Sequence, residues 1–264
     1  MIEKGSGLTN CKTLKILNEN KTPMDATVLA ALEDLSQIAV GLMDGSVILI
    51  KSTDVAKDRF PKMKTIVKPT GFPVTGLEYR QLKGSVVLFI TDEKTVKRCV
   101  TSNKEYPVLE LESGQGAEPF CTCLSEENEL VVGRSEAVYF YEPEGRGPCV
   151  VFEGKKKMIY WFRQYLVIIS QPGEDRQFHA INIYNLKDKF IAFSISNFPA
   201  ISHIVSEWGS IFIRTQRGEV CPLLFPPFPS SSILSPFKLS LLLLSPFKLF
   251  PPPFKLSPPP FISF

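Results

Sequence analysis

The sequence predicts an all-β fold, an incomplete β-propeller of the WD40 type with about four to five recognisable blades, followed by a disordered tail rich in Pro, Phe and Leu. Short β-rich runs recur along the chain, and no long amphipathic helix interrupts them. The runs begin at positions 38, 87, 130, 166 and 211, so that successive separations are 49, 43, 36 and 45 residues. Because a four-stranded propeller blade takes about 40–45 residues, this spacing favours one blade for each run.

Similar strands and turns flank the recurring runs. The runs are IAVGL, VLFITD, LVVGRS, LVIIS and IFIRTQ, and a further strand precedes several of them, as in VTGLEYR, FCTCLSE and ISHIVSE. A turn and another strand follow. In the first unit this turn is Asp44-Gly45, a dipeptide that favours a two-residue hairpin because both positions tolerate positive φ. In the fourth unit, the polar stretch NLKDK joins the two strands of 181–194.

The sequence also allows two alternatives, a helix at 24–36 and a β-sandwich architecture. The stretch 24–36, MDATVLAALEDLS, has apolar residues that could be placed at helical spacing, but it falls where the first strand of a unit belongs. We therefore predict a strand and a turn there. A β-sandwich, with turns every 8–12 residues, is the alternative architecture. A propeller closes its ring by pairing its first blade with its last, and an unclosed ring leaves strand edges exposed. With only four to five recognisable units, we expect the chain to be a fragment of a larger ring.

The composition changes after Cys221. Residues 222–264 consist almost wholly of Pro, Phe, Leu, Ser and Lys, and the pentamer SPFKL occurs at 235–239 and again at 245–249. Proline removes backbone donors and opposes regular structure. The longest apolar run between lysines in this tail is far shorter than the roughly 20 residues of a membrane-spanning helix, so no transmembrane segment is predicted. We expect a flexible start at 1–10, a partial β-propeller at 11–221 and a low-complexity tail at 222–264.

The composition also limits the classes of function. Hydrophobic residues make up 44% of the chain, which suits a protein with a real core. A net charge of only +3 argues against a nucleic-acid partner. The six cysteines include no C-x-x-C pair, and the two histidines lie far from any zinc spacing, so we predict no metal and no cofactor. The cysteines are expected to be free thiols, buried or half-buried, in a reducing compartment.

Few residues carry a chemical signal. The stretch GRGPCVVFEGKKK lacks the glycine-lysine spacing of a phosphate-binding loop. Lys155, Lys156 and Lys157 form a candidate interaction surface for acidic lipid or an acidic patch of a partner, and the alternative is a solvated turn. Trp161-Phe162 and Trp208 are expected to pack between blades rather than anchor a partner. His203 in the run AISHIV suits a core or edge histidine. There is no G-x-S-x-G motif, and we predict no catalytic residue.

Several stretches resemble one known family. The block RGPCVVFEGKKKMIYWFRQYLVIIS at 146–170 strongly resembles the amino-terminal propeller of the vacuolar protein sorting-associated protein 11 family. Other stretches agree in order, namely IAVGLMDGSVILI, DVAKDR, FPVTGLEYR, KEYPVLELES, INIYNLKDKFIAFS and SEWGSIFIRTQRGEV. The resemblance covers about 28–220. The tail at 222–264 departs from the family pattern, and we expect that it is not native family sequence.

The resemblance implies a cellular role. Members of this family belong to the class C core of the HOPS and CORVET tethering complexes. A non-enzymatic scaffold fragment is therefore expected, acting in protein transport and membrane fusion at the late endosome and the vacuole or lysosome. Its partners would be the other class C subunits, and its membrane association would be peripheral, from the cytoplasm. Any ubiquitin-ligase activity would belong to a RING-type domain outside this chain. The alternatives are a generic WD40-type adaptor and a propeller enzyme with a central site.

Overall fold

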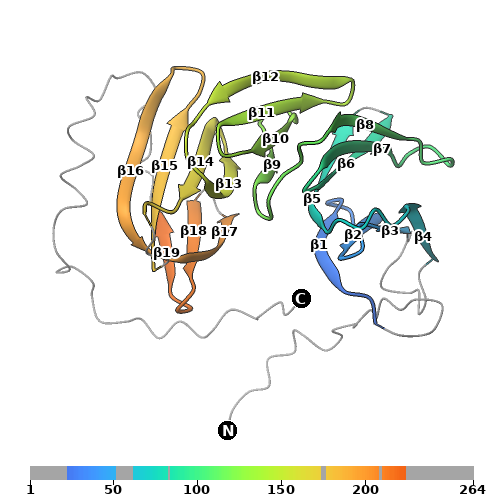
Figure 1. The fold of residues 1–264 in the computed structure, drawn as a ribbon, viewed down its shortest axis with the longest axis horizontal. Helices are drawn as coiled ribbons and strands as arrows, with labels where there is room; N and C mark the ends of the chain where they lie inside the picture. The colour runs from blue at the N-terminus through green and yellow to red at the C-terminus, as the bar shows by residue number, and fades with distance from the viewer. Residues whose placement is uncertain (1–22, 52–61, 83, 174–176, 208–209, 224–264) are drawn as a thin grey trace, which may run out of the picture. The chain divides into compact units, whose positions relative to one another are not determined.

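The computed structural model describes residues 23–51, 62–82, 84–173, 177–207 and 210–223. These residues form 19 β-strands and no helix, and the strands make five antiparallel sheets that follow one another in chain order (Figure 1). The predicted all-β propeller is confirmed, with five blades. The expected flexible start at 1–10 and the tail at 222–264, apart from its first two residues, lie outside the described residues, and the domain bounds 11–221 stay a prediction.

The first four sheets have four strands each and the fifth has three. The strands of the first two sheets are β1 (Ala26–Ala31), β2 (Gln37–Leu42), β3 (Val47–Lys51), β4 (Lys62–Val67), β5 (Val74–Leu82), β6 (Ser85–Asp92), β7 (Thr95–Val100) and β8 (Val108–Ser113). Those of the third and fourth are β9 (Thr122–Leu124), β10 (Leu130–Gly133), β11 (Ala137–Glu142), β12 (Gly145–Val151), β13 (Lys156–Phe162), β14 (Tyr165–Ser170), β15 (Phe178–Asn185) and β16 (Phe190–Pro199). The fifth sheet holds β17 (Ile201–Glu207), β18 (Ser210–Thr215) and β19 (Val220–Leu223).

Each recurring run of the sequence is the second strand of its sheet. The five runs fall on β2, β6, β10, β14 and β18. Strands β2, β6, β10 and β14 are apolar and buried almost throughout because both of their faces are covered, whereas burial alternates along β18 and Arg214 is exposed. In β6, for example, Leu88 packs toward the first sheet, whereas Phe89 packs toward the third. Strand β1 also occupies the place predicted for it, and the stretch 24–36 is a strand followed by a turn rather than a helix.

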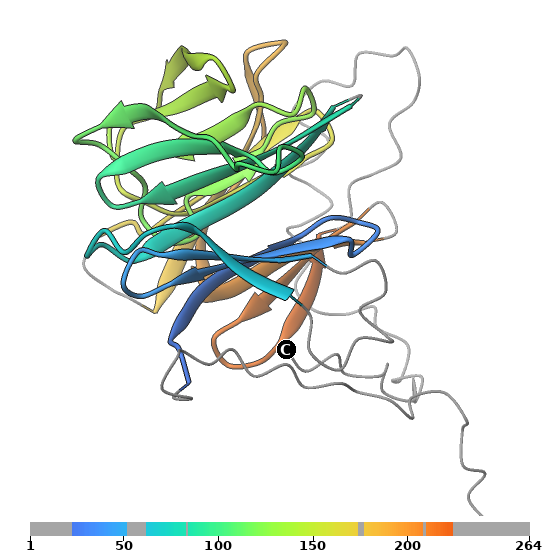
Figure 2. The ribbon, with the colours of Figure 1, turned by 90° about the vertical axis from the view of Figure 1, so that its right-hand side faces the viewer.

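Four hydrophobic clusters hold the five sheets together. Each cluster fills one space between successive sheets, and the packing of the first sheet on the second can be followed in Figure 2. Within the described ranges no such cluster joins the first sheet to the fifth. The last sheet also presents exposed apolar side chains, with Val205 53% and Val220 61% exposed. The described blades therefore form an open series rather than a closed ring.

The hairpin between β2 and β3 differs from the predicted two-residue turn. The loop covers Met43 to Ser46, and the amide of Gly45 donates to the carbonyl of Leu42 at 3.1 Å. Only Gly45 takes a positive φ, of 86°, while Asp44 does not. The geometry is that of a longer hairpin loop with one left-handed residue at its end. Asp44 instead uses its carboxylate to accept the Ser46 amide at 2.9 Å.

The cysteine prediction holds for most of the described thiols and fails for one. Cys99, Cys121 and Cys123 are buried and Cys221 is half-buried, and all are free. Cys149 is exposed, which corrects the expectation. It lies on β12, the outermost strand of its sheet, where nearly all residues are exposed. Cys11 lies outside the described residues.

The aromatic residues singled out in the sequence lie mainly between sheets. Phe162 is 5% exposed in the cluster between the fourth and fifth sheets. The ring of Trp161 meets that of Phe140, on the third sheet, edge to face at 6.3 Å between centroids. Packing between blades is therefore confirmed for this pair, while Trp208 lies outside the described residues. His203 is exposed on β17, the end strand of its sheet, as an edge histidine.

Candidate interaction site

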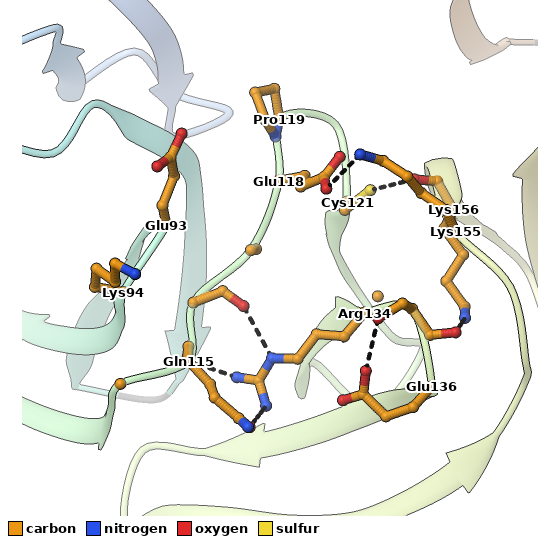
Figure 3. A pocket seen from close by; sticks show the side chains of 15 residues that line it. Glu93, Lys94, Gln115, Glu118, Pro119, Cys121, Arg134, Glu136, Lys155 and Lys156 are labelled. Carbon is orange, nitrogen blue, oxygen red and sulfur yellow. Dashed lines mark hydrogen bonds and ion pairs between the residues drawn. The ribbon is translucent and has the colours of Figure 1, made fainter.

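A polar cavity of about 790 Å³ lies where the turns of three sheets meet (Figure 3). It is lined by the β6–β7 turn, the loop from β8 to β9, the β10–β11 turn and the β12–β13 turn. Charged side chains of both signs surround it, including Glu93, Lys94, Glu118 and Lys155. We refer to this cavity below as the inter-sheet pocket.

Arg134 forms the base of the inter-sheet pocket. Its guanidinium donates to the backbone carbonyls of Gln115 at 2.8 Å and Gly116 at 2.9 Å, and to the Glu112 carboxylate at 3.2 Å (Figure 3 shows the contacts with Gln115). It also donates to the hydroxyl of Tyr141 at 2.9 Å. The planar fork of arginine suits such a set of acceptors. Arg134, which follows β10 in the third sheet, thereby fixes the loop that leaves the second sheet.

Glu112 is the charge that balances this arginine. Its carboxylate accepts from Arg134, from Arg146 at 3.0 Å and from the hydroxyl of Tyr141. Burial raises the pKa of the Glu112 carboxyl, but the hydrogen bonds from Tyr141 and Arg134 outweigh burial and hold the pKa below its usual range. Burial and the bond to Glu112 raise the pKa of Tyr141. Glu112 therefore stays ionised and Tyr141 neutral near pH 7.

The three lysines predicted as an interaction surface have different environments. Lys155 is exposed, and its amine pairs with Glu118 at 2.8 Å. Lys156 is only 3% exposed, and its amine donates to the carbonyls of Ser135, Phe152 and Gly154. Burial lowers the pKa of Lys156. Lys157 is half-buried on β13 and does not line the inter-sheet pocket.

The interaction surface expected at Lys155, Lys156 and Lys157 stays a prediction, and the structure shows how each side chain is placed. Lys156 lines the inter-sheet pocket but is buried, and its amine is held by carbonyls of the β12–β13 turn. Strand β13 begins at Lys156. Because successive side chains of a strand point to opposite faces of the sheet, the side chains of Lys156 and Lys157 lie on different faces. Of the three, Lys155 is the residue that faces solvent at the pocket, and its role as a contact residue stays a prediction.

Cys121 is the thiol that lines the inter-sheet pocket. Burial raises the pKa of the Cys121 thiol to about 12, so this thiol is protonated at neutral pH and is a poor nucleophile. Its sulfur donates to the carbonyl of Lys156 at 3.5 Å. Within the described ranges, no group of three or more His, Cys, Asp or Glu residues could hold a metal ion. The rim of the pocket carries exposed charges of both signs, and such charges orient protein partners during association.

Sequence reasoning did not identify Arg134, Glu112 or Glu118. Arg134 stands alone after the run LVVG. Most of its acceptors lie 18 to 22 residues earlier in the chain, on the end of β8 and the loop after it. No local motif connects the two segments. The stretch 145–157, whose glycines resemble a phosphate-binding loop only loosely, forms β12, the turn after it and the start of β13.

The five sheets and their packing define a WD40-like β-propeller. Solved propellers are similar in fold: the C-terminal WD40 domain of Sif2 has a TM-score of 0.52 at 16% identity, covering 81% of this chain and 62% of that chain. A crystal structure of BBS1N in complex with ARL6DN has a TM-score of 0.55 at 13% identity, covering 80% of this chain and 68% of that one. At such identities the likeness concerns the fold alone.

The sequence comparisons identify the family. The model of the PEP5/VPS11 N-terminal family matches residues 2–224, and the chain belongs to this family. The vacuolar protein sorting-associated protein 11 homolog of Mus musculus is 37% identical over 216 residues, which cover 75% of this chain and 22% of that protein. The homolog of Dictyostelium discoideum is 34% identical over 238 residues, covering 75% of this chain and 25% of that protein. The chain thus spans about a quarter of the length of these relatives.

No helix in the described ranges is long and apolar enough to span a membrane.

Proposed function

We propose that the chain is a non-enzymatic scaffold of vacuolar protein sorting, working as the propeller of a vesicle-tethering subunit. The observation that carries the proposal is the family match over residues 2–224, supported by relatives named for vacuolar protein sorting. In this proposal the chain takes part in membrane tethering and fusion at the late endosome and the vacuole or lysosome. It is a cytoplasmic protein that reaches these membranes peripherally, through its complex.

The proposed partners are the other class C subunits of the HOPS and CORVET complexes. The inter-sheet pocket is the proposed contact, because its rim carries exposed charges of both signs on turns that three sheets hold in place. Rim charges mainly set the orientation and association rate of protein partners. Lys155 and Glu118 are the residues proposed to meet the partner, since both side chains are more than half exposed.

Co-purification from cells of the source organism tests this function. The tagged 264-residue chain is expected to recover the other class C subunits, and Lys155→Glu, which places two carboxylates together, is expected to reduce the recovery. Lys104→Glu is the matched control, because Lys104 is exposed in the β7–β8 turn and does not line the pocket. A folded chain that recovers no class C subunit contradicts the proposed function. Recovery of class C subunits that is equal for both variants contradicts the proposed contact alone.

A further inference from the structure

A second cavity lies away from the inter-sheet pocket and differs from it in chemistry. It encloses about 400 Å³ between β12, the outer strand of the third sheet, and the β15–β16 hairpin of the fourth sheet (Figure 1 labels these strands). Its lining is mainly apolar and consists of Val150, Phe152, Tyr184, Asn185, Leu186, Lys189, Phe190 and Ile191. We call it the rim groove.

Bulky apolar side chains stand exposed along the rim groove. Phe190 is 48% exposed and Ile191 is 56% exposed, and both belong to β16. Val150, on the opposite side, is 36% exposed. At the base of the groove the rings of Phe152 and Tyr184 pack against each other, with 4.6 Å between their centroids. A preformed apolar groove of this volume is of the size that accepts one or two large side chains.

Lys189 lines the rim groove, and Lys187 precedes it on the same turn. The turn after β15 carries Lys187 and Lys189, and within the described ranges neither forms an ion pair. The carboxylate of Asp188, between them, accepts a hydrogen bond from the side chain of Asn185 at 2.9 Å. Asn185 is 2% exposed, so it holds the turn in place. Two lysines beside an apolar groove, neither of them paired with a described carboxylate, complement a ligand with acidic residues next to apolar ones.

The strands beside the rim groove favour an extended ligand. Within the described ranges, β12 pairs only with β11 and β16 pairs only with β15, so each strand has one edge without a strand partner. Such edges bind extended peptides through their backbone groups. The hydroxyl of Tyr184, for which no hydrogen bond to a described residue exists, offers one further polar contact at the floor.

We propose that the rim groove is a docking site for a short extended peptide segment of a partner protein, in which a bulky aliphatic or aromatic residue is flanked by acidic residues. The apolar side chain enters between Val150 and Ile191, and the flanking carboxylates meet Lys187 and Lys189. The inference does not depend on the proposed tethering function, because it rests on the lining and charge of the groove alone.

Fluorescence anisotropy with the full 264-residue chain tests the proposal. Three fluorescein-labelled decapeptides serve as probes: a Leu-Phe pair flanked by glutamates, the same pair flanked by lysines, and a Ser-Ser pair flanked by glutamates. The first is expected to bind at least about tenfold more tightly than the other two. Equal binding of all three, or binding of none of them, overturns the proposal.

Variants assign the binding to the rim groove. Ile191→Asp is expected to weaken the glutamate-flanked peptide by about tenfold or more, because it places a charge in the apolar wall. Leu109→Asp is the matched control, since Leu109 is 45% exposed on β8 and does not line the groove. The double change Lys187→Glu and Lys189→Glu is expected to reverse the preference, in favour of the lysine-flanked peptide. Retention of the original preference in this variant contradicts the assigned role of the two lysines.

Sedimentation velocity separates a peptide from a second copy of the chain. If the chain self-associates, if Ile191→Asp abolishes the association and if no peptide binds, the occupant is a second copy and the proposal is overturned. A folding defect is recognised by circular dichroism, and Ile191→Thr, which removes apolar surface without adding charge, then replaces Ile191→Asp. This milder variant is expected to weaken the glutamate-flanked peptide by about threefold or more.

Discussion

Replacing Arg134 with methionine should loosen the junction between the second and third sheets. The side chain of Arg134 is 9% exposed and forms an ion pair with Glu112. It also donates to the carbonyls of Gln115 and Gly116. Methionine has a similar length but offers no donor. The Arg134→Met variant therefore leaves two backbone carbonyls and one buried carboxylate with fewer partners.

The loss of stability in Arg134→Met depends on the partners that Glu112 retains. Breaking a buried ion pair by removing one partner costs about 3–5 kcal/mol. Glu112 keeps Arg146 and the Tyr141 hydroxyl, and its side chain is 14% exposed, so we expect the lower end of that range, about 3 kcal/mol. Arg134→Lys retains the charge but not the fork of donors, and we expect it to cost about 1–2 kcal/mol.

Native-state hydrogen exchange read by mass spectrometry is the appropriate assay, because it reports opening of individual segments. Peptides that span β8 to β11 should exchange about 100-fold faster in Arg134→Met, which corresponds to about 3 kcal/mol. Peptides of the first sheet should exchange as before. Arg146→Met is the control, and because the Arg146 side chain is 43% exposed, it should cost about 1 kcal/mol or less.

Two results would refute this reasoning. A change below about 1 kcal/mol in Arg134→Met would mean that the contacts of the guanidinium contribute no more than those of a surface residue. An equal acceleration of exchange in all five sheets would mean that the substitution acts on global stability rather than on this junction.

Three further predictions concern the same part of the fold. Gly116→Ala should destabilise the β8–β9 loop by about 2 kcal/mol or more in hydrogen exchange, because an added Cβ would lie 1.7 Å from the carbonyl oxygen of Asp92. In the native chain, iodoacetamide should modify Cys149 at pH 8 far faster than the buried thiols of Cys99, Cys121 and Cys123, as read by mass spectrometry. Burial raises the pKa of Asp92, but hydrogen bonds from the turn after it hold the pKa below its usual value of 3.8. Its stabilising contribution should be complete above about pH 5 and lost as the pH falls below about 4, and Asp92→Asn should lack this loss in an acid titration followed by circular dichroism.

The sequence was sufficient to predict the fold because the second strands of the first four sheets are covered on both faces. Burial on both faces selects continuous apolar runs, as in β6 and β14, and these runs recur at the spacing of the blades. The outer strands give a weaker signal, since both faces of a strand such as β12 are largely exposed. The spacing of these runs therefore predicted the succession of blades more securely than it predicted the ends of individual strands.

The sites could not be predicted in the same way, because they depend on contacts between sheets. Arg134 and the loop that it holds belong to different sheets, and the sequence does not show that their turns face each other. The lysine run shows the same limit on a smaller scale. Whether Lys155 or Lys156 faces solvent depends on the residue at which β13 begins, and a shift of one residue exchanges the two faces of a strand. The sequence shows three adjacent lysines, whereas the residue at which β13 begins determines which of their side chains are exposed.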